Sequence, residues 1–321
     1  MTGMLYSLII PAYNAEKTIG RCLVSALEQL QGSPNVEVIV VDDGSTDGTA
    51  NTARLTAERY PEVITHVISQ ANAGVSAARN AGIASAKSAY LGFMDGDDFW
   101  LPEHWQEVSR RLTDGSSPDI VEFNAITVDQ HGTQAGSLNM CLSGGSNVVN
   151  VDLDVLLRYA ALHKHFPWAR VYRAGLFESR LFPVNRHYED NGAMPWMYAA
   201  AHRLSSINKP LLAYTIQDGN SITGQSAKIG QSIDLASYTA DAMEEAKHSD
   251  SLRLYWYLIA ARAAAANHAL IRRLRWSHRL RALRVARRIP KIPYGCVSNS
   301  EWVKLRFPAL YFLFLSLRSA R

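Results

Sequence analysis

Three short apolar runs, each followed by a turn signal, constrain the fold of this chain most strongly. They are residues 5–11 (LYSLIIP), 36–41 (VEVIVV) and 90–94 (YLGFM). Short apolar runs bounded by turn residues are typical of buried strands in a parallel sheet. These three runs therefore predict the central strands of one sheet.

The segments between these runs have helical patterns. Residues 15–30, 46–60 and 74–87 are predicted as helices, and Thr46 or Asp47 could cap the second. In the first helix one face collects the apolar side chains Ile19, Leu23, Ala26, Leu27 and Leu30. Alternation of strand and helix predicts an open α/β sheet wound by strand–helix–strand units over the first ~115 residues.

The remainder of the chain is less regular. Residues 119–128 predict a strand, 132–147 a loop or hairpin, and 152–162 a helix. The segment HYEDNGAMPWMYAAAHR, from 187 on, predicts a helix that opens with acids. From 231 the composition turns to Ala, Arg and Leu and predicts further helices.

Acidic residues follow two of the predicted strands. Asp42 and Asp43 follow one, and the sequence DGDD follows another with Asp95, Asp97 and Asp98. Ligands of open α/β sheets bind at the carboxyl ends of the strands, and carboxylates two residues apart suit Mg²⁺ or Mn²⁺. The alternatives from the residues alone are a polar turn at 95–98 and a helix cap at 42–43.

The joint order of four blocks distinguishes these alternatives. PAYNAE, VVDDGSTD, QANAGVSAARN and FMDGDD follow one another over residues 5–105, which closely resemble the nucleotide-sugar-binding half of family-2 glycosyltransferases. The resemblance implies the GT-A (Rossmann-like) fold, a mixed, mostly parallel sheet flanked by helices, here with a C-terminal helical extension. It also implies transfer with inversion from a nucleotide-diphospho-sugar, most often a UDP-sugar, and a divalent cation, Mn²⁺ or Mg²⁺.

The resemblance assigns roles to individual positions of the first half. Asp43 would hydrogen-bond the base, Asp95 would contact the ribose or the donor sugar, and Asp97 would bind the metal that bridges the two phosphates. The other matched positions would surround the base and ribose or lie beneath the donor: Pro11, Ala12, Tyr13, Glu16, Asn72, Gly74 and Arg79.

The second half is expected to supply the catalytic base. Inverting transfer needs a carboxylate that takes the proton of the attacking hydroxyl. HYEDN at 187–191 resembles the family's Glu-Asp motif, in which Asp190 matches the base and Glu189 its neighbour. The alternative is that both acids merely favour a helix N-terminus. Arg170 and Gln217 depart from the commoner Lys and Arg of the family, which weakens any phosphate role there.

Charge is divided unevenly along the chain. Residues 251–321 carry 15 Lys and Arg against one acid, a charge of +14, whereas residues 1–250 carry 18 against 28, a charge of −10. Arginines alternate with Leu and Trp over 252–288, and an 11-residue apolar run at 307–317 is too short to span a bilayer. The prediction is a basic helical region that associates with an anionic membrane surface; the alternative is a helical hairpin packed on the catalytic part.

The predicted organisation has three parts. Residues 1–115 would bind the nucleotide sugar, 116–230 would bind the acceptor and hold the base, and 231–321 would form the basic helical region. Three widely spaced cysteines and no recognisable secretory signal predict a cytoplasmic protein, peripheral on the inner face of the cytoplasmic membrane.

The acceptor would be a glycan or a lipid-linked saccharide, as in the biosynthesis of surface polysaccharides. Two other functions stay open: a nucleotidyltransferase, and a basic nucleic-acid-binding protein on an α/β scaffold. The PAYNAE segment lacks the Gly-rich, basic phosphate loop expected of the first. The acidic clusters would repel the phosphate backbone in the second, so no nucleic-acid partner is expected.

Overall fold

The computed structural model describes residues 3–142, 148–216 and 225–272. It divides into two compact units. The first comprises residues 1–151, 166–185 and 196–219, and the second comprises 152–165, 186–195 and 220–321. The two units are defined by packing, and each combines segments that are distant in the sequence. The three-part organisation predicted from the sequence concerns the roles of consecutive parts of the chain and stays a prediction.

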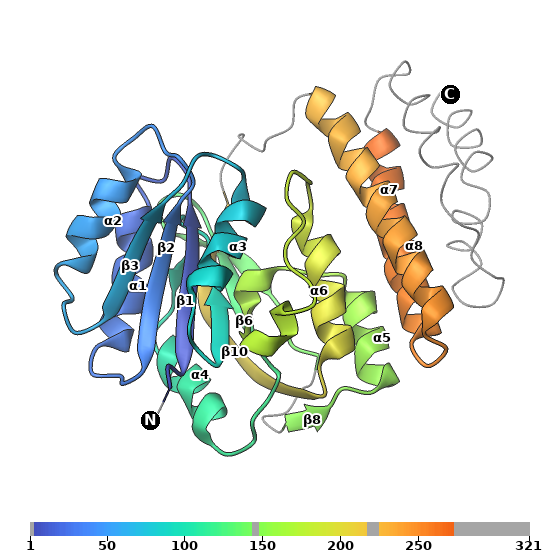
Figure 1. Cartoon of the computed structure of the whole chain (residues 1–321), viewed down its shortest axis with the longest axis horizontal. Helices are drawn as coiled ribbons and strands as arrows, with labels where there is room; N and C mark the ends of the chain where they lie inside the picture. The colour runs from blue at the N-terminus through green and yellow to red at the C-terminus, as the bar shows by residue number, and fades with distance from the viewer. Residues whose placement is uncertain (1–2, 143–147, 217–224, 273–321) are drawn as a thin grey trace. The chain divides into compact units, whose positions relative to one another are not determined.

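The first unit is built on a ten-stranded sheet of order β3-β2-β1-β4-β9-β6-β10-β5, with β7 beside β6 and β8 beside β10. Figure 1 shows β1, β2 and β3 side by side. The strands are β1 Tyr6–Ala12, β2 Val36–Asp42, β3 Ile64–Ser69, β4 Tyr90–Phe93, β5 Phe99–Trp100, β6 Ile120–Val128, β7 Gln134–Leu138, β8 Val148–Asn150, β9 Arg170–Arg173 and β10 Arg203–Thr215.

Most of the central neighbours are parallel. The pairs β1–β2, β2–β3, β1–β4 and β6–β10 run parallel, whereas β9 lies antiparallel between β4 and β6. The short strands β5, β7 and β8 pair antiparallel. The predicted mixed, mostly parallel sheet flanked by helices is therefore confirmed.

Helices cover both faces of the parallel strands. They are α1 Ile19–Leu30, α2 Thr49–Ala57, α3 Val75–Ser85 and α4 His104–Thr113. The predicted apolar stripe of α1 is buried in full, and Cys22 joins it. Side chains alternate along β2: Val38 and Val40 pack in the α1 core, whereas Ile39 and Val41 pack with Ala78 of α3. This packing fixes which strand ends lie together.

The cap of one helix differs from the sequence prediction. Helix α2 begins after Gly48, and neither Thr46 nor Asp47 occupies the cap position, although Asp47 accepts a hydrogen bond from the Thr49 N–H. Strand β10 contains Pro210, which would interrupt a regular ladder. The register with β6 shifts on both sides of Pro210, so an irregularity accommodates the proline.

The second unit is helical. It contains α5 Leu153–Leu162, the first turns of α6 Glu189–Ala200, and the long pair α7 Gln225–His248 and α8 Arg253–Arg272. Figure 1 draws α7 and α8 next to one another in orange, and each buries apolar side chains such as Leu235, Met243 and Trp256. The start of the predicted basic region is therefore a packed helix. Its Arg-rich part from 273 and its apolar run at 307–317 lie outside the described residues.

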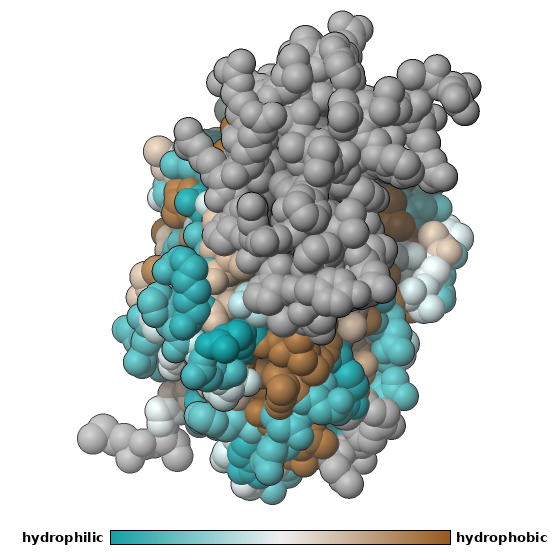
Figure 2. Space-filling view, turned by 90° about the vertical axis from the view of Figure 1, so that its right-hand side faces the viewer, coloured by the Kyte–Doolittle hydropathy of each residue, from teal (hydrophilic) through white to brown (hydrophobic). Residues whose placement is uncertain are grey.

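Apolar side chains also reach the surface of the second unit. Figure 2 shows hydrophobic residues between hydrophilic ones on one face of the molecule. Leu153, Tyr188 and Leu254 are among the exposed large hydrophobic side chains of this unit. Within the described parts of the chain, no helix combines the length and the apolar character that a membrane crossing needs.

Candidate active site

The carboxyl ends of β1, β2 and β4 assemble the residues that the sequence singles out in the first unit. The Asp43 N–H donates to the Ala12 carbonyl over 2.9 Å, which ties the end of β2 to the end of β1. A Cβ at Gly96 would lie 3.4 Å from the Pro11 carbonyl oxygen and 3.5 Å from the Ala12 Cβ. The DGDD turn after β4 therefore touches the segment predicted to surround the base.

Asp43 holds the loop that leads into α3. Its Oδ1 accepts from the Gln70 side-chain amide (2.7 Å) and the Ala73 N–H (3.0 Å), and its Oδ2 accepts from the Gly74 N–H (2.7 Å). The residue is only 3% exposed. The structure thus gives Asp43 a structural role in holding the loop between β3 and α3, and its contact with a base stays a prediction.

A glycine-dependent turn after β2 lets these loops approach each other. Gly44 has φ +73°, and a Cβ there would lie 2.7 Å from the Asn72 backbone nitrogen. A side chain at this position would combine a left-handed backbone with a backbone clash. Gly44 therefore allows the Asn72 loop to pack against the turn after β2.

The PAYNAE turn is fastened to the loop before α2. The Asn14 N–H donates to Ser45 Oγ (2.9 Å), and Asn14 Oδ1 accepts from the Thr46 N–H (2.9 Å). The Glu16 N–H donates to Asp47 Oδ2 over 3.2 Å. Tyr13 is 52% exposed, and Glu16 is also exposed. Both side chains lie on the solvent side of this turn, where a ligand could reach them.

A buried ion pair orients Asp95. Arg79 of α3 reaches Asp95 Oδ1 with its Nη2 at 2.8 Å, and the two side chains are 4% and 30% exposed. The Arg79 guanidinium also lies over the Phe182 ring, 5.3 Å from its centroid. The buried Arg79 thus fixes the Asp95 carboxylate, which stays partly exposed to solvent.

Asp97 and Asp98 differ sharply in environment. Asp98 is fully buried, and its Oδ1 accepts the Thr215 N–H over 2.8 Å. Burial, followed by the charges of Asp95 and Asp97, raises the pKa of the Asp98 carboxyl well above its usual range. Asp97 is half-buried. Asp98 therefore anchors the turn, and Asp97 is the member of this pair that faces outward.

Two residues outside the DGDD turn hold it in place, and the sequence predicts neither of them. Arg21 of α1 donates to the Asp97 carbonyl (3.0 Å), and Thr215 Oγ1 donates to the same carbonyl (2.7 Å). The Arg21 guanidinium also stacks on the Phe99 ring at 4.5 Å. Nothing local in the sequence marks these contacts, because Thr215 is 118 residues from Asp97.

The second unit holds the other two predicted residues. Glu189 and Asp190 form the first turn of α6, where negative charge stabilises a helix N-terminus. Both are half-buried. Asp190 Oδ1 accepts from the Asn191 N–H (2.9 Å) and from the Asn191 side-chain amide (3.0 Å). These two contacts fix the orientation of the Asp190 carboxylate at the start of α6.

The first unit also presents carboxylates that suit a hard cation. Mg²⁺ and Mn²⁺ sites in nucleotide enzymes use one or two protein carboxylates together with substrate phosphates. Asp97 and Asp95 supply such a pair at one strand end. Among the described residues no group of three or more acids, histidines or cysteines forms a complete metal site. The donor set therefore fits a cation shared with a ligand's phosphates.

Comparisons with known proteins agree with this geometry. Residues 7–144, less than half of the chain, match the family model "Glycosyl transferase family 2". Over 222 residues the chain is 29% identical to glycosyltransferase GlyA of Streptococcus pneumoniae, covering 67% of this chain and 31% of that protein. It is 30% identical over 224 residues to the uncharacterised glycosyltransferase EpsJ of Bacillus subtilis, covering 68% and 63%. The chain thus spans less than two thirds of either relative.

Two solved structures share the fold. S. aureus TarS 1–349 in complex with UDP-GlcNAc matches with a TM-score of 0.67 at 20% identity, over 90% of this chain and 82% of that one. A mannosyltransferase of Pyrobaculum calidifontis in complex with GDP-Man and Mn²⁺ matches more distantly, with a TM-score of 0.54 at 18% identity. It covers 98% of this chain and 84% of that one.

Proposed function

Residues 7–144 place this chain in glycosyl transferase family 2, and from that premise we propose that it transfers a sugar from a UDP-sugar to an acceptor hydroxyl. The acceptor is a glycan or a lipid-linked saccharide of the kind used to build surface polysaccharides. Membership of this family, which is inverting in general, favours this reaction over nucleotidyl transfer and over nucleic-acid binding.

One observation carries the proposal: the carboxyl ends of β1, β2 and β4 lie together, with Asp43 holding the loop before α3 and Asp95 and Asp97 in the turn after β4. The roles proposed for individual residues follow the motif matches. Pro11, Ala12, Tyr13 and Glu16 surround the base and ribose. The remaining donor contacts come from Asp43, Asn72, Gly74, Arg79 and Asp95.

The transfer step is a single displacement. The acceptor oxygen attacks the anomeric carbon while the bond from that carbon to the diphosphate oxygen breaks, and the bonding pair leaves with the nucleoside diphosphate. Asp190 takes the proton of the acceptor hydroxyl, because an ionised carboxylate is the base that inverting transfer requires. Glu189 is the neighbouring acid of the same motif and adds a second acidic side chain to the first turn of α6.

A divalent cation is proposed to complete the donor site. Asp97 would hold it, with Asp95 beside it. A bound Mn²⁺ or Mg²⁺ would stabilise the negative charge that develops on the departing diphosphate. Arg21 and Thr215 support this proposal, since both donate to the Asp97 backbone carbonyl. The buried Asp98 also fixes the turn, because it accepts the Thr215 N–H.

The proposed place of action is the cytoplasmic face of a membrane. The support is the charge of +14 on residues 251–321 and the lipid-linked acceptor class. Anionic lipid attracts such a segment, and an acceptor anchored in the bilayer would be presented at the same surface.

A donor screen tests the proposed function. Purified protein is incubated with UDP-, GDP- and dTDP-sugars, with Mn²⁺ or with EDTA, and read by thermal shift and by release of the free nucleotide. The proposal expects stabilisation and nucleotide release with at least one UDP-sugar, and loss of both signals in EDTA. No response to any nucleotide sugar would contradict it.

A further inference from the structure

Helix α7 binds residues 186–187, which lie just before the Glu189–Asp190 turn, through hydrogen bonds and ion pairs. The α7 residues that face this segment recur at one-turn spacing and so occupy one side of the helix. They are Gly230, Asp234, Ser237, Tyr238 and Asp241. All of them, and the segment that they hold, belong to the second unit.

Asp234 makes two of these contacts, both to His187. Its Oδ2 accepts from the His187 backbone N–H and from the His187 ring nitrogen Nδ1, each over 2.9 Å. The Asp234 and His187 side chains are 15% and 38% exposed. Because a carboxylate only accepts, Nδ1 carries the proton, and the ring is held in one orientation. A Cβ at Gly230 would lie 3.1 Å from the His187 ring, so the ring lies against the helix.

Other α7 side chains near Asp234 also bind His187 and its neighbour Arg186. The Tyr238 hydroxyl donates to the His187 carbonyl over 3.1 Å, so both peptide groups of His187 are fixed by α7. Arg186 donates from Nη1 to Ser237 Oγ (3.1 Å) and lies 3.7 Å from Asp241 Oδ2. Burial, and then the charge of Asp234, raises the pKa of Tyr238, and Glu189 and Asp190 add to the rise. Both acids therefore lie within electrostatic reach of this helix face.

The chain needs this support because it turns sharply before α6. Tyr188 has φ +53°, a left-handed conformation that is unfavourable for a residue with a large side chain. The Tyr188 carbonyl accepts the Asn191 N–H over 3.0 Å, which closes the turn over Glu189 and Asp190. Such a conformation persists only where the surrounding structure imposes it, and Asp234 acts one residue away.

We propose that Asp234 is a positioning residue for the Glu189–Asp190 turn and acts on it through both the backbone and the ring of His187. The proposal rests on the proposed function, since it assumes that Asp190 is the base. It assigns α7, which lies outside the matched residues 7–144, a direct part in forming the catalytic turn.

The test compares Asp234→Ala, Asp234→Asn and the control Glu244→Gln. Glu244 also lies on α7, but it is exposed and pairs within the helix with Lys247 and His248. The Asn variant keeps an oxygen that can accept both N–H bonds but loses the charge that strengthens them. Circular dichroism and thermal melting check that each variant is folded, and amide hydrogen exchange over residues 183–192 measures the turn.

The expected exchange rates rise about tenfold in Asp234→Ala, less in Asp234→Asn, and not at all in Glu244→Gln. The kcat for release of UDP from the best UDP-sugar of the donor screen falls about 10- to 100-fold in Asp234→Ala, because a displaced base is a poor base. The donor KM stays within about twofold. In an Asp190→Asn background the same substitution causes no further loss of kcat.

Unchanged amide exchange over residues 183–192 in a folded Asp234→Ala variant would overturn the proposal. So would a further loss of kcat, as large as in the wild-type background, when Asp234→Ala is added to Asp190→Asn. A wild-type protein that releases nucleotide from no sugar donor would instead overturn the proposed function. The exchange data would still decide whether Asp234 holds the turn, so the two failures are distinguishable.

Discussion

Asp97 is the residue on which the proposed metal dependence rests. It lies half-buried at the end of β4, while its neighbour Asp98 is buried and hydrogen-bonded to the Thr215 N–H. Asp97→Ala should abolish transfer and weaken metal-dependent binding of UDP, measured by calorimetry with and without Mn²⁺. The melting temperature should change little, because the contacts of Arg21 and Thr215 go to the Asp97 backbone carbonyl. Full activity in this variant, or in EDTA, would exclude Asp97 as the metal ligand.

Asp190 carries the second prediction. Asp190→Asn keeps the shape of the side chain and removes its ability to take a proton. Turnover should fall by roughly 10²–10⁴, the usual effect of losing general-base assistance, with donor binding unchanged. Steady-state kinetics with the best donor of the screen separate the two effects. A loss of donor affinity as large as the loss of turnover would indicate a binding role, and retained turnover would make Glu189 the next candidate.

A third prediction concerns a buried histidine. His104 is 1% exposed, stacks on Trp100 at 3.9 Å, and donates from Nδ1 to the Leu211 carbonyl over 2.8 Å. Burial lowers the pKa of His104 to about 3, against about 6.5 in an unfolded chain. Between these values only the unfolded state binds the proton. The contribution of His104 to stability is therefore complete above about pH 6.5 and is lost as the pH falls.

The measurement is the free energy of unfolding in urea at several pH values between 4 and 6.5. For wild type one proton at His104 contributes a slope of up to about 1.4 kcal/mol per pH unit. His104→Phe keeps the aromatic contact and should lack this part of the slope; the Leu211 carbonyl retains the Leu101 N–H as a partner. His131→Gln, a substitution of an exposed histidine, is the control. Equal slopes in wild type and His104→Phe would contradict the prediction.

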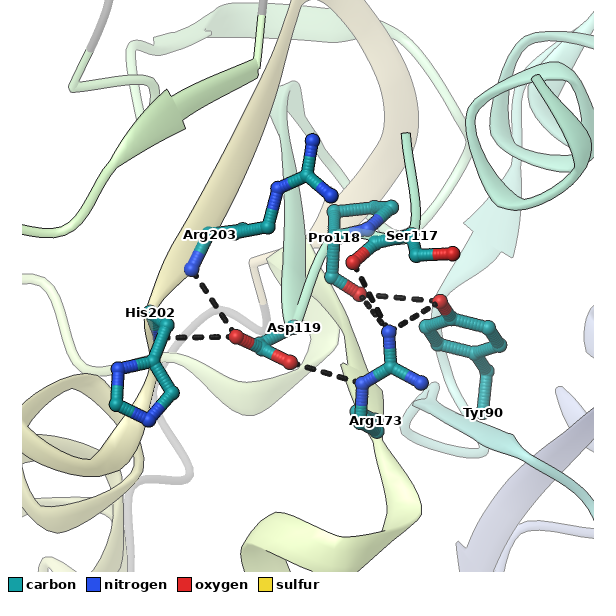
Figure 3. A network of polar contacts seen from close by, with 7 residues as sticks. All are labelled: Tyr90, Ser117, Pro118, Asp119, Arg173, His202 and Arg203. Atoms are coloured by element: carbon teal, nitrogen blue, oxygen red, sulfur yellow. Dashed lines mark hydrogen bonds and ion pairs between the residues drawn. The ribbon is translucent and has the colours of Figure 1, made fainter. Parts of the chain in front are cut away.

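At the scale of elements, one polar network fastens the opposite end of the sheet. Figure 3 shows Asp119 and Arg173 between the first residues of β4 and β10. Asp119 accepts from the N–H groups of His202 (2.8 Å) and Arg203 (3.0 Å) and from Arg173 Nε (2.8 Å). Arg173 also donates to the hydroxyl of Tyr90 over 3.0 Å. The network thus joins the amino ends of parallel strands whose carboxyl ends form the site.

Asp119→Ala should destabilise the protein by about 2–4 kcal/mol, because three donors lose a charged acceptor. Burial alone would raise the pKa of Asp119, but its donors outweigh burial and lower it, so its contribution is present above about pH 4 and lost below. Activity per folded molecule should be unchanged. The control is Asp154→Ala, which removes an exposed pair with Arg158 and should cost about 0.5 kcal/mol or less. Similar unfolding free energies for both variants would refute the network's role.

The sequence predicted those elements whose pattern is local. The strands β1, β2, β4 and β6 and the helices α1, α3 and α5 lie within a few residues of the expected ranges, because apolar period and turn residues define them. Strands β3 and β9 were missed. The first has exposed or half-buried side chains, and the second begins and ends with arginine, so it contains no apolar run. Strand β10 was obscured by Pro210, whose accommodation depends on its partner β6.

The candidate site divides in the same way. Asp95, Asp97 and the PAYNAE turn could be identified because each is a short motif at a strand end. The residues that anchor them could not: Arg21 and Thr215 meet the DGDD turn only in the folded sheet, and Asp234 lies 47 residues from His187. Such long-range partners carry no local signal, so only the structure reveals which side chains hold the motif residues in place.

At the scale of the whole molecule, the charge division makes a prediction about membranes. An acidic body of −10 and a basic C-terminal region of +14 should bind anionic vesicles through that region. Each basic residue near an anionic surface contributes about 1 kcal/mol, and exposed charges are screened over about 8 Å at physiological salt. Not all arginines can reach the surface at once, so the total is well below the sum.

The test uses the full chain with four arginines of the Leu- and Trp-rich stretch replaced together: Arg279, Arg281, Arg284 and Arg287. Replacement by Gln should weaken co-sedimentation with phosphatidylserine-containing vesicles by about 10- to 100-fold at low salt, since 1.4 kcal/mol corresponds to a factor of ten. Replacement by Lys keeps the charge and should preserve most binding, and added salt should weaken wild type toward the Gln variant. Equal binding of wild type to neutral and anionic vesicles would refute the electrostatic attraction. No binding to either would favour the alternative of a packed helical hairpin.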